Sequence, residues 1–363
     1  MDIHIFIAHM GIGGAERVCV NLSNELSALG NQVHIAVLNL DNDINTPLLD
    51  KRVKVHSLNV SRLRYSIFAM LKYIKKNKPA FMLVFGNEMA VILNKLKKLH
   101  LINTPLIVRV LNNVEITLSE EDHVSPVVEN YLKKAQKQLA DMQHVIAQCE
   151  GMGEMLLKNG LVEKENLSVI YNPVSEYLIH NTIRNTDVNK EKQIVFVGRI
   201  DPQKNLPHMV KAFAKVLEKR PDTRLRLIGD GNSRESLTAL IKELGIEAKI
   251  SIEGVTDHIE KVYAEADVIA LTSEYEGMPN CLIEAIGIGI PVVSYDCPLG
   301  PAEIIVDDVN GYLVTYNDID MMADRLLKAL DREWDVEKIK ETCNKFRVQE
   351  IAKRYLQVFD KYK

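Results

Sequence analysis

Residues 271–285 read LTSEYEGMPNCLIEA, and this stretch predicts a strand, a sharp turn and a short helix in succession. The apolar run 267–271 is typical of a strand buried on both faces. Gly277 permits a tight backbone turn, and the apolar residues after it predict a helix over 281–286. Glu276 and Glu284 stand on either side of the helix start. A helix that begins just after a strand favours an anionic ligand, and carboxylates accept hydrogen bonds from hydroxyls such as those of a sugar.

Strands and helices alternate along both halves of the chain. The first half has predicted strands at 3–8, 33–38, 53–57, 81–85, 106–110, 144–148 and 167–171, and the second half at 194–197, 225–228, 250–252, 268–271, 292–295 and 311–314. This alternation predicts an α/β fold of two doubly wound, Rossmann-like domains that face a cleft, each built on a parallel sheet covered by helices. Ligands bind such sheets at the carboxyl ends of the strands.

We predict an N-terminal domain at residues 1–175 and a C-terminal domain at 193–345. The polar stretch 176–192 lacks periodicity and is interpreted as a linker. Residues 346–363 carry apolar side chains at roughly helical spacing, which predicts a C-terminal helix.

Composition excludes several classes of protein. The chain has 363 residues, 47% of them hydrophobic, and a formal net charge of −4, so nothing indicates a nucleic-acid partner. The five cysteines are scattered and have no CxxC spacing, which favours a reducing, cytoplasmic location over a disulfide framework. We see no signal peptide and no apolar run of about 18 residues that would span a membrane.

A second motif, FVGRIDPQKNL at 196–206, follows a predicted strand that ends at Gly198. Arg199 is able to bind two phosphate oxygens in a fork, and Lys204 adds a point charge, so the pair is typical of a diphosphate clamp. The alternative is a surface loop with ordinary solvated cations. The two carboxylates at the end of another strand of the same sheet favour the clamp.

The first predicted strand is followed by the glycine-rich loop HMGIGGAER at 9–17. Gly13 and Gly14 allow backbone N–H groups to approach a phosphate or a sugar at a helix start. A dinucleotide-binding fingerprint is the competing interpretation, but Glu16 stands where its third glycine should be, and the second strand lacks the expected acid at its end. A purely structural turn also remains open.

Residues 51–100 contain 12 Lys and Arg residues and a single acid, Glu88. The part at 62–98 predicts a basic amphipathic helix that lies on an anionic membrane surface or binds phosphates of an acceptor. The alternative is a solvated helix face.

We predict no metal site. Asp41 with Asp43, and Asp318 with Asp320, have a D-x-D spacing but are interpreted as turn and N-cap residues, and the ten histidines show no HxxxH or HxH cluster.

The Pro- and Gly-rich loop 297–301 beside the opening stretch either shapes the pocket or is purely structural.

These motifs resemble the retaining GT-B glycosyltransferases of family 4. The resemblance rests on Gly198-Arg199 with Lys204-Asn205, on the E-x7-E pattern of Glu276 and Glu284, on Gly300-Pro-Ala-Glu303 before Asn310-Gly311, and on the glycine loop 13–17. It covers nearly the whole chain. The motifs are most similar to those of bacterial enzymes that extend lipid-linked oligosaccharides or surface polysaccharides.

The resemblance implies a role for each matched residue. Gly198, Arg199 and Lys204 would hold the donor diphosphate, and Glu284 would bind the ribose. The base would lie near Val255, and the donor sugar would be bound by Glu276, Gly277, Met278 and Asn280. Gly13 and Gly14 would approach the phosphate and the acceptor. Glu276, Arg199 and Lys204 would be the catalytic set. The N-terminal domain would bind the acceptor, the C-terminal domain the nucleotide-sugar, and the C-terminal helix would cross back onto the first domain.

The chain departs from the family pattern at two places. Met278-Pro279 stands where many relatives have Phe-Gly, and Pro279 lacks an N–H. Many relatives carry a histidine at the end of a strand of the first domain, where this chain has Asn112 or Asn113.

The resemblance implies transfer of a hexose or N-acetylhexosamine, with retention, from a UDP-linked sugar to a lipid-linked glycan in surface polysaccharide synthesis. The expected location is cytoplasmic and peripheral on the inner face of the membrane, and we expect no resident cofactor. The alternatives are a transferase for a small soluble acceptor and a non-catalytic subunit that binds sugar nucleotides.

Overall fold

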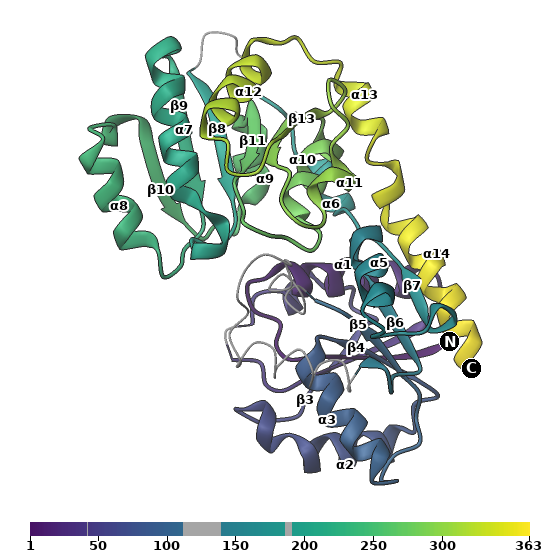
Figure 1. The fold of residues 1–363 in the computed structure, drawn as a ribbon. Coiled ribbons are helices and arrows are strands. Elements are labelled where there is room, and N and C mark those ends of the chain that lie inside the picture. The colour runs from purple at the N-terminus through teal and green to yellow at the C-terminus, as the bar shows by residue number, and fades with distance from the viewer. Residues whose placement is uncertain (42, 112–138, 186–190) are drawn as a thin grey trace. The chain divides into compact units, whose positions relative to one another are not determined.

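The computed structural model describes residues 1–41, 43–111, 139–185 and 191–363 (Figure 1). The chain divides into two compact units, one of Met1–Pro173 with Phe346–Lys363 and the other of Val174–Lys345. Each unit is a parallel sheet flanked by helices, which confirms the predicted α/β fold. Asn112 and Asn113 lie outside the described residues.

The first unit contains a seven-stranded sheet in the order β3-β2-β1-β4-β5-β6-β7. Its strands are β1 Asp2–Ile7, β2 Gln32–Val37, β3 Lys54–Ser57, β4 Met82–Phe85, β5 Leu106–Arg109, β6 His144–Ala147 and β7 Leu167–Val169. Its described helices are α1 Gly14–Ala28, α2 Ile67–Asn77, α3 Asn87–Lys98, α5 Glu150–Lys158 and α14 Val348–Phe359. The strand order reverses between β1 and β4, so the loops that follow these two strands stand where such sheets bind ligands.

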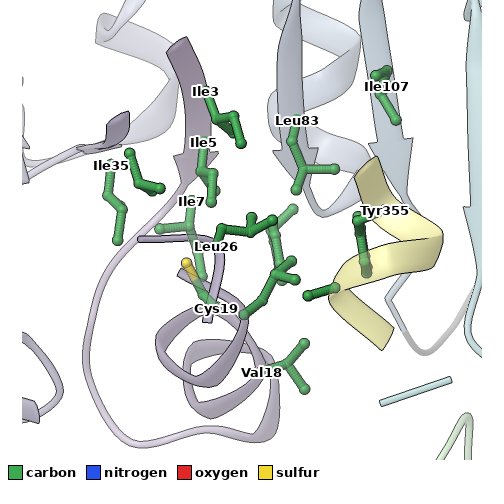
Figure 2. Packing of buried hydrophobic residues seen from close by; sticks show 14 of the residues in the cluster. Ile3, Ile5, Ile7, Val18, Cys19, Leu26, Ile35, Leu83, Ile107 and Tyr355 are labelled. Atoms are coloured by element: carbon green, nitrogen blue, oxygen red, sulfur yellow. The ribbon is translucent and has the colours of Figure 1, made fainter. Parts of the chain in front are cut away.

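The core of this unit lies between the central strands, α1 and α14. Alternate residues of β1, Ile3, Ile5 and Ile7, point to this side of the sheet, as the period of a strand requires (Figure 2). Helix α14 comes from the far end of the sequence and packs on α1, with the Phe359 ring stacked on Phe81 at 4.7 Å between centroids. The predicted return of the C-terminal helix to the first domain is confirmed.

Arg109, at the end of β5, joins three parts of the first unit. Its guanidinium is buried and donates to the Tyr355 hydroxyl at 2.6 Å, to the Ile170 carbonyl at 3.4 Å and to Asn172 Oδ1. These acceptors lie on α14 and on the segment just before the chain leaves the unit at Pro173. Arg109 therefore joins the end of β5 to α14 and to the segment just before Pro173.

The second unit contains a six-stranded sheet in the order β10-β9-β8-β11-β12-β13. Its strands are β8 Lys192–Val197, β9 Thr223–Ile228, β10 Ile250–Gly254, β11 Val268–Leu271, β12 Val292–Tyr295 and β13 Gly311–Val314. Its described helices are α6 Glu176–Asn181, α7 Leu206–Lys219, α8 Arg234–Glu243, α9 Ile259–Glu265, α10 Asn280–Ile288, α11 Pro301–Ile304, α12 Ile319–Asp331 and α13 Val336–Glu341. Here the order reverses between β8 and β11, and the two motifs singled out from the sequence follow these two strands.

The predicted linker 176–192 is more structured than its sequence indicates. It contains α6, and β8 already begins at Lys192. The Ser175 hydroxyl accepts a hydrogen bond from the Leu178 N–H, and the Leu178 side chain is buried. A helix of six residues completes fewer than two turns, so it has no apolar periodicity to detect.

The two D-x-D pairs hold turns and helix starts. Asp318 caps α12, since its Oδ1 accepts from the Met321 N–H at 2.8 Å. Asp43 Oδ1 accepts from the backbone N–H groups of Asn45 and Thr46. The interpretation of Asp43 and Asp318 as turn and N-cap residues is confirmed.

His144 gives the stability of the first unit a defined pH dependence. Burial, with the nearby Lys361 charge, lowers its pKa from 6.5 to about 4. In the unfolded chain His144 takes up a proton as pH falls through 6.5, whereas in the folded chain it does so only near pH 4. The free energy of unfolding therefore decreases as pH falls from 6.5 to about 4. We expect the free energy of unfolding by urea to fall more steeply between pH 7.5 and 5 in the wild type than in His144→Gln. Equal slopes would contradict this assignment.

Candidate functional site

The site is built from two loops that follow the neighbouring strands β8 and β11. The Glu274 N–H donates to the Gln203 carbonyl at 2.8 Å, and Gln203 Nε2 donates to the Tyr275 carbonyl at 2.8 Å. The Thr272 hydroxyl bonds the Lys204 and Asn205 carbonyls, each at 3.1 Å. These bonds join loops 199–205 and 272–276 into one rigid unit.

The centre of this unit is a buried ion pair. Lys204 Nζ lies 2.6 Å from Glu276 Oε1, and the two side chains are 14% and 4% exposed. The Ser273 hydroxyl donates to the same carboxylate oxygen at 2.6 Å, and the Glu276 N–H donates to the Pro298 carbonyl at 3.3 Å. The sequence indicated separate roles for Lys204 and Glu276, and the structure brings the two together. Because an ammonium has three N–H donors, Lys204 keeps donors for a further ligand.

Arg199 differs from Lys204 in its surroundings. Its side chain is 66% exposed, with Nη1 at 2.9 Å from Asp201 Oδ2 and Nη2 donating to Gln203 Oε1 at 3.4 Å. An exposed pair of this kind is worth at most about 1 kcal/mol, so the guanidinium is able to leave Asp201 for a more highly charged anion. The site thus offers one fixed cation and one adaptable cation.

Glu284 lies one turn into α10 and is held from α9. Its Oε2 accepts from the hydroxyl of Tyr263 at 2.6 Å, and the Tyr263 ring is completely buried. An ionised carboxylate is able to accept hydrogen bonds from more than one hydroxyl group. Tyr263 is a site residue that the sequence reasoning missed, since it is 21 positions away and carries no motif.

Pro279, a departure from the family pattern, has a clear place as the N-cap residue of α10. Its carbonyl accepts from the Leu282 and Ile283 N–H groups at 3.2 and 3.4 Å, and an N-cap residue needs no N–H of its own. The helix therefore starts with the N–H groups of Asn280 and Cys281. Gly300 (φ 88°) packs on the turn, because a Cβ there would lie 2.7 Å from the Gly277 carbonyl oxygen. Loop 297–301 thus supports the turn structurally.

The carboxyl ends of β8, β9 and β10 approach one another through glycines. A Cβ on Gly229 would lie 1.8 Å from the Gly198 carbonyl oxygen, and one on Gly231 would lie 2.6 Å from the Ile200 carbonyl oxygen. The Gly229 N–H donates to the Gly254 carbonyl, and Val255, the predicted base contact, follows with its side chain half exposed. The sequence reasoning missed Gly229-Asp-Gly231, although two glycines directly after a predicted strand were a usable signal.

The glycine loop of the first unit is closed from two sides. Asn45, buried after β2, donates through Nδ2 to the Met10 and Gly11 carbonyls. The Glu16 carboxylate folds over Gly13, where a Cβ would lie 2.0 Å from its Oε2, and it also lies 3.1 Å from His9 Nδ1. Glu16 therefore occupies the space above the loop, which argues against a dinucleotide there. Gly14 is exposed at the first turn of α1.

Comparison with known proteins agrees with this geometry. HepE from Anabaena, solved in complex with UDP and glucose, has a TM-score of 0.78 at 18% identity, and the match covers 99% of this chain and 100% of that one. The family model "Glycosyltransferase Family 4" matches residues 12–176, and "Glycosyl transferases group 1" matches residues 181–347. The chain is a GT-B glycosyltransferase.

Two relatives match most of the length of this glycosyltransferase in sequence. The amylovoran biosynthesis glycosyltransferase AmsD of Erwinia amylovora is 27% identical, with 88% of this chain and 87% of that protein covered. The N-acetylgalactosamine-N,N'-diacetylbacillosaminyl-diphospho-undecaprenol 4-alpha-N-acetylgalactosaminyltransferase of Campylobacter jejuni is 28% identical, with 90% and 89% covered.

Two cysteines lie beside the site of the glycosyltransferase. Burial, reinforced by the Glu276 charge, raises the pKa of Cys281 to about 12 and raises that of Cys297 as well. Both thiols therefore stay protonated at neutral pH. A thiol is a poor nucleophile compared with a thiolate, so the chemistry of the site does not come from these cysteines.

The difference between the two cations predicts a difference in stability. Lys204→Ala leaves the Glu276 carboxylate buried without its counter-ion, which should cost about 3–5 kcal/mol in the free energy of unfolding. Arg199→Ala removes only an exposed pair and should cost about 1 kcal/mol or less. Urea unfolding of both variants tests this, and the double variant Lys204→Met/Glu276→Gln should recover much of the loss. Equal losses for the two single variants would contradict the assignment.

Proposed function

We propose that this glycosyltransferase moves a hexose or N-acetylhexosamine from a UDP-linked donor to a hydroxyl of a lipid-linked glycan, in the synthesis of a surface polysaccharide. The observation that carries the proposal is the buried Lys204–Glu276 pair, which lies with Arg199 and the start of α10 around the reversal point of the second sheet. Support comes from the UDP complex of HepE and from the names of the Erwinia and Campylobacter relatives. Retention of anomeric configuration is proposed on the motif resemblance.

The proposed chemistry is stabilisation of the departing diphosphate. Negative charge on the leaving oxygen grows as the bond to the sugar breaks, so groups that are positioned beforehand to meet this charge lower the barrier. Lys204 is held in place by Glu276, Arg199 exchanges its bond to Asp201 for phosphate oxygens, and the first N–H groups of α10 add the positive end of the helix dipole. In this proposal no step uses a metal ion.

The two carboxylates have different roles in the proposal. Glu284, held by Tyr263, accepts hydrogen bonds from the ribose hydroxyls. Glu276, together with the backbone at Gly277, Met278 and Asn280, binds the donor sugar and fixes Lys204 at the same time. The nucleotide base lies near Val255, at the carboxyl end of β10.

The acceptor side of the proposal rests on helix α2 of the first unit. Met70, Tyr73 and Ile74 bury one face of this helix, while Lys72, Lys75 and Lys76 are exposed on the other. Phe68, in its first turn, is 85% exposed. Exposed cations next to an exposed aromatic ring are typical of a helix that lies on an anionic membrane surface. Among the described residues, the helices are too short or too polar to cross a membrane.

Donor binding and transfer give the first functional test. A panel of UDP-, GDP- and ADP-sugars should raise the melting temperature only for UDP-linked members, because a ligand of the native state stabilises it by mass action. Arg199→Ala and Glu284→Ala should each lower transfer at least about tenfold, since a lost bond to a charged group costs about 1.5–3 kcal/mol. Near wild-type turnover in both would contradict the site assignment. Stabilisation by a UDP-sugar without release of UDP to any acceptor would favour the non-catalytic alternative.

Sedimentation with anionic liposomes tests the membrane surface. Changing Lys72, Lys75 and Lys76 to Glu should abolish binding at low salt, because each basic residue near an anionic surface contributes about 1 kcal/mol. The matched control changes the exposed Lys242, Lys338 and Lys361 to Glu. It alters the net charge of the protein by the same amount but leaves α2 unchanged. Equal binding of the two triple variants, or no binding of the wild type, would exclude α2 as the membrane surface and leave the soluble-acceptor alternative.

A further inference from the structure

A cluster of histidines lies on the first sheet, on the face covered by α2. It contains Asp2 and His4 on β1, His34 on β2 and His56 on β3, with Tyr73 of α2 above them. His4 and His34 are register partners in the parallel pairing of β1 with β2. Their rings stack at 4.7 Å between centroids, and the His34 and His56 rings stack at 5.3 Å. The cluster is near the amino end of β1, whereas the glycine loop follows the carboxyl end of the same strand.

The donor atoms of Asp2, His4 and His34 have the spacing of a metal site. Asp2 Oδ1 lies 3.3 Å from His4 Nε2 and 3.3 Å from His34 Nε2, and the three donor atoms lie within 4.8 Å of one another. Tetrahedral zinc with bonds of about 2.0–2.1 Å to nitrogen and oxygen separates its ligand atoms by about 3.3 Å. Both carboxylate–imidazole distances therefore match one edge of such a site.

The other ring nitrogens have the partners that metal-bound histidines require. His4 Nδ1 lies 2.8 Å from the Tyr73 hydroxyl, and His34 Nδ1 lies 3.0 Å from His56 Nε2. With protons on both Nδ1 atoms, these bonds orient the rings and leave each Nε2 with a lone pair for a metal ion. His4 Nε2 is buried and faces the Asp2 carboxylate at 3.3 Å.

Charges of both signs surround the cluster. Lys54 acts on His34 and His56, and Lys76 acts on His56. Asp2 acts in the opposite direction on His4 and His34. The carboxylate of Asp2 supplies the negative charge that offsets the nearby lysines.

We propose that Asp2, His4 and His34 bind a zinc ion, with water as the fourth ligand. The two imidazole rings are inclined by only 12°, so their lone pairs run nearly parallel, and zinc binding turns the rings toward Asp2. Two nitrogens and one carboxylate oxygen suit zinc in a tetrahedral site. The ion joins β1 to β2 and stabilises the first unit. The proposal is independent of the proposed function, because these residues lie outside the candidate functional site.

Zinc binding to the whole protein tests the proposal directly. The protein should carry no polyhistidine tag, since a tag binds zinc itself. Calorimetric titration with ZnCl2 should give one equivalent of tight binding, and the melting temperature should rise with the free zinc concentration. Cobalt(II) at the same site should show the intense visible absorption of four-coordinate cobalt. These readouts need no activity measurement.

Variants separate this site from adventitious binding. Asp2→Asn and His34→Ala should each weaken zinc binding at least about tenfold. Asp2 is exposed, so its amide variant tests ligation without removing packing. His180→Ala is the matched control, because His180 Nε2 also lies 3.3 Å from a carboxylate oxygen, that of Glu176, and the His180 side chain is exposed. Absence of tight binding, or binding that neither Asp2→Asn nor His34→Ala weakens, would overturn the proposal.

Discussion

The bond between Lys204 and Glu276 is the interaction on which the candidate site depends. Two charges with so little exposure are stable only when each is paired and their remaining polar atoms are satisfied, and here Ser273 completes the carboxylate's shell. The pair joins the loops that follow the neighbouring strands β8 and β11. The hydrogen bonds of Gln203 with Glu274 and Tyr275 connect the same two loops. The turn at Gly277 and the start of α10 are therefore fixed relative to β8 before any ligand arrives.

This arrangement divides the positive charge of the site into two kinds. Lys204 is held rigidly, so little reorganisation is needed when negative charge develops near it. Arg199 lies in a weak exposed pair, which in the proposed function would let it follow a diphosphate as it enters and leaves. Gly300 and Pro279 add rigidity to the helix start, since each is packed against the turn between strand and helix. A fixed cation and an adaptable cation together suit a ligand that must be both bound and released.

The sequence motifs indicate the charged residues of the candidate site but not the side chains that they contact. Lys204 and Glu276 are 72 positions apart, and nothing in either motif shows that they meet, because their contact follows from the adjacency of β8 and β11. Tyr263 was missed for the same reason. The contact between His4 and His34 is likewise absent from the linear spacing, because strand register brings the two residues together. The short helix α6 was missed because six residues give no periodicity. The described part of the fold followed the alternation of strands closely, since parallel sheets buried on both faces have continuous apolar strands.

The same strand order is used in both units, yet the two reversal points are chemically different. In the second unit the loops after β8 and β11 present cations and a helix start, which match a polyphosphate. In the first unit the loop after β1 is closed by Asn45 and by the Glu16 carboxylate, which places a negative charge over Gly13. Positive charge in the first unit lies instead on the surface of α2. The proposed transfer from a nucleotide donor to an anionic lipid carrier would need two positive regions that do not compete for one ligand, and the two units carry one such region each.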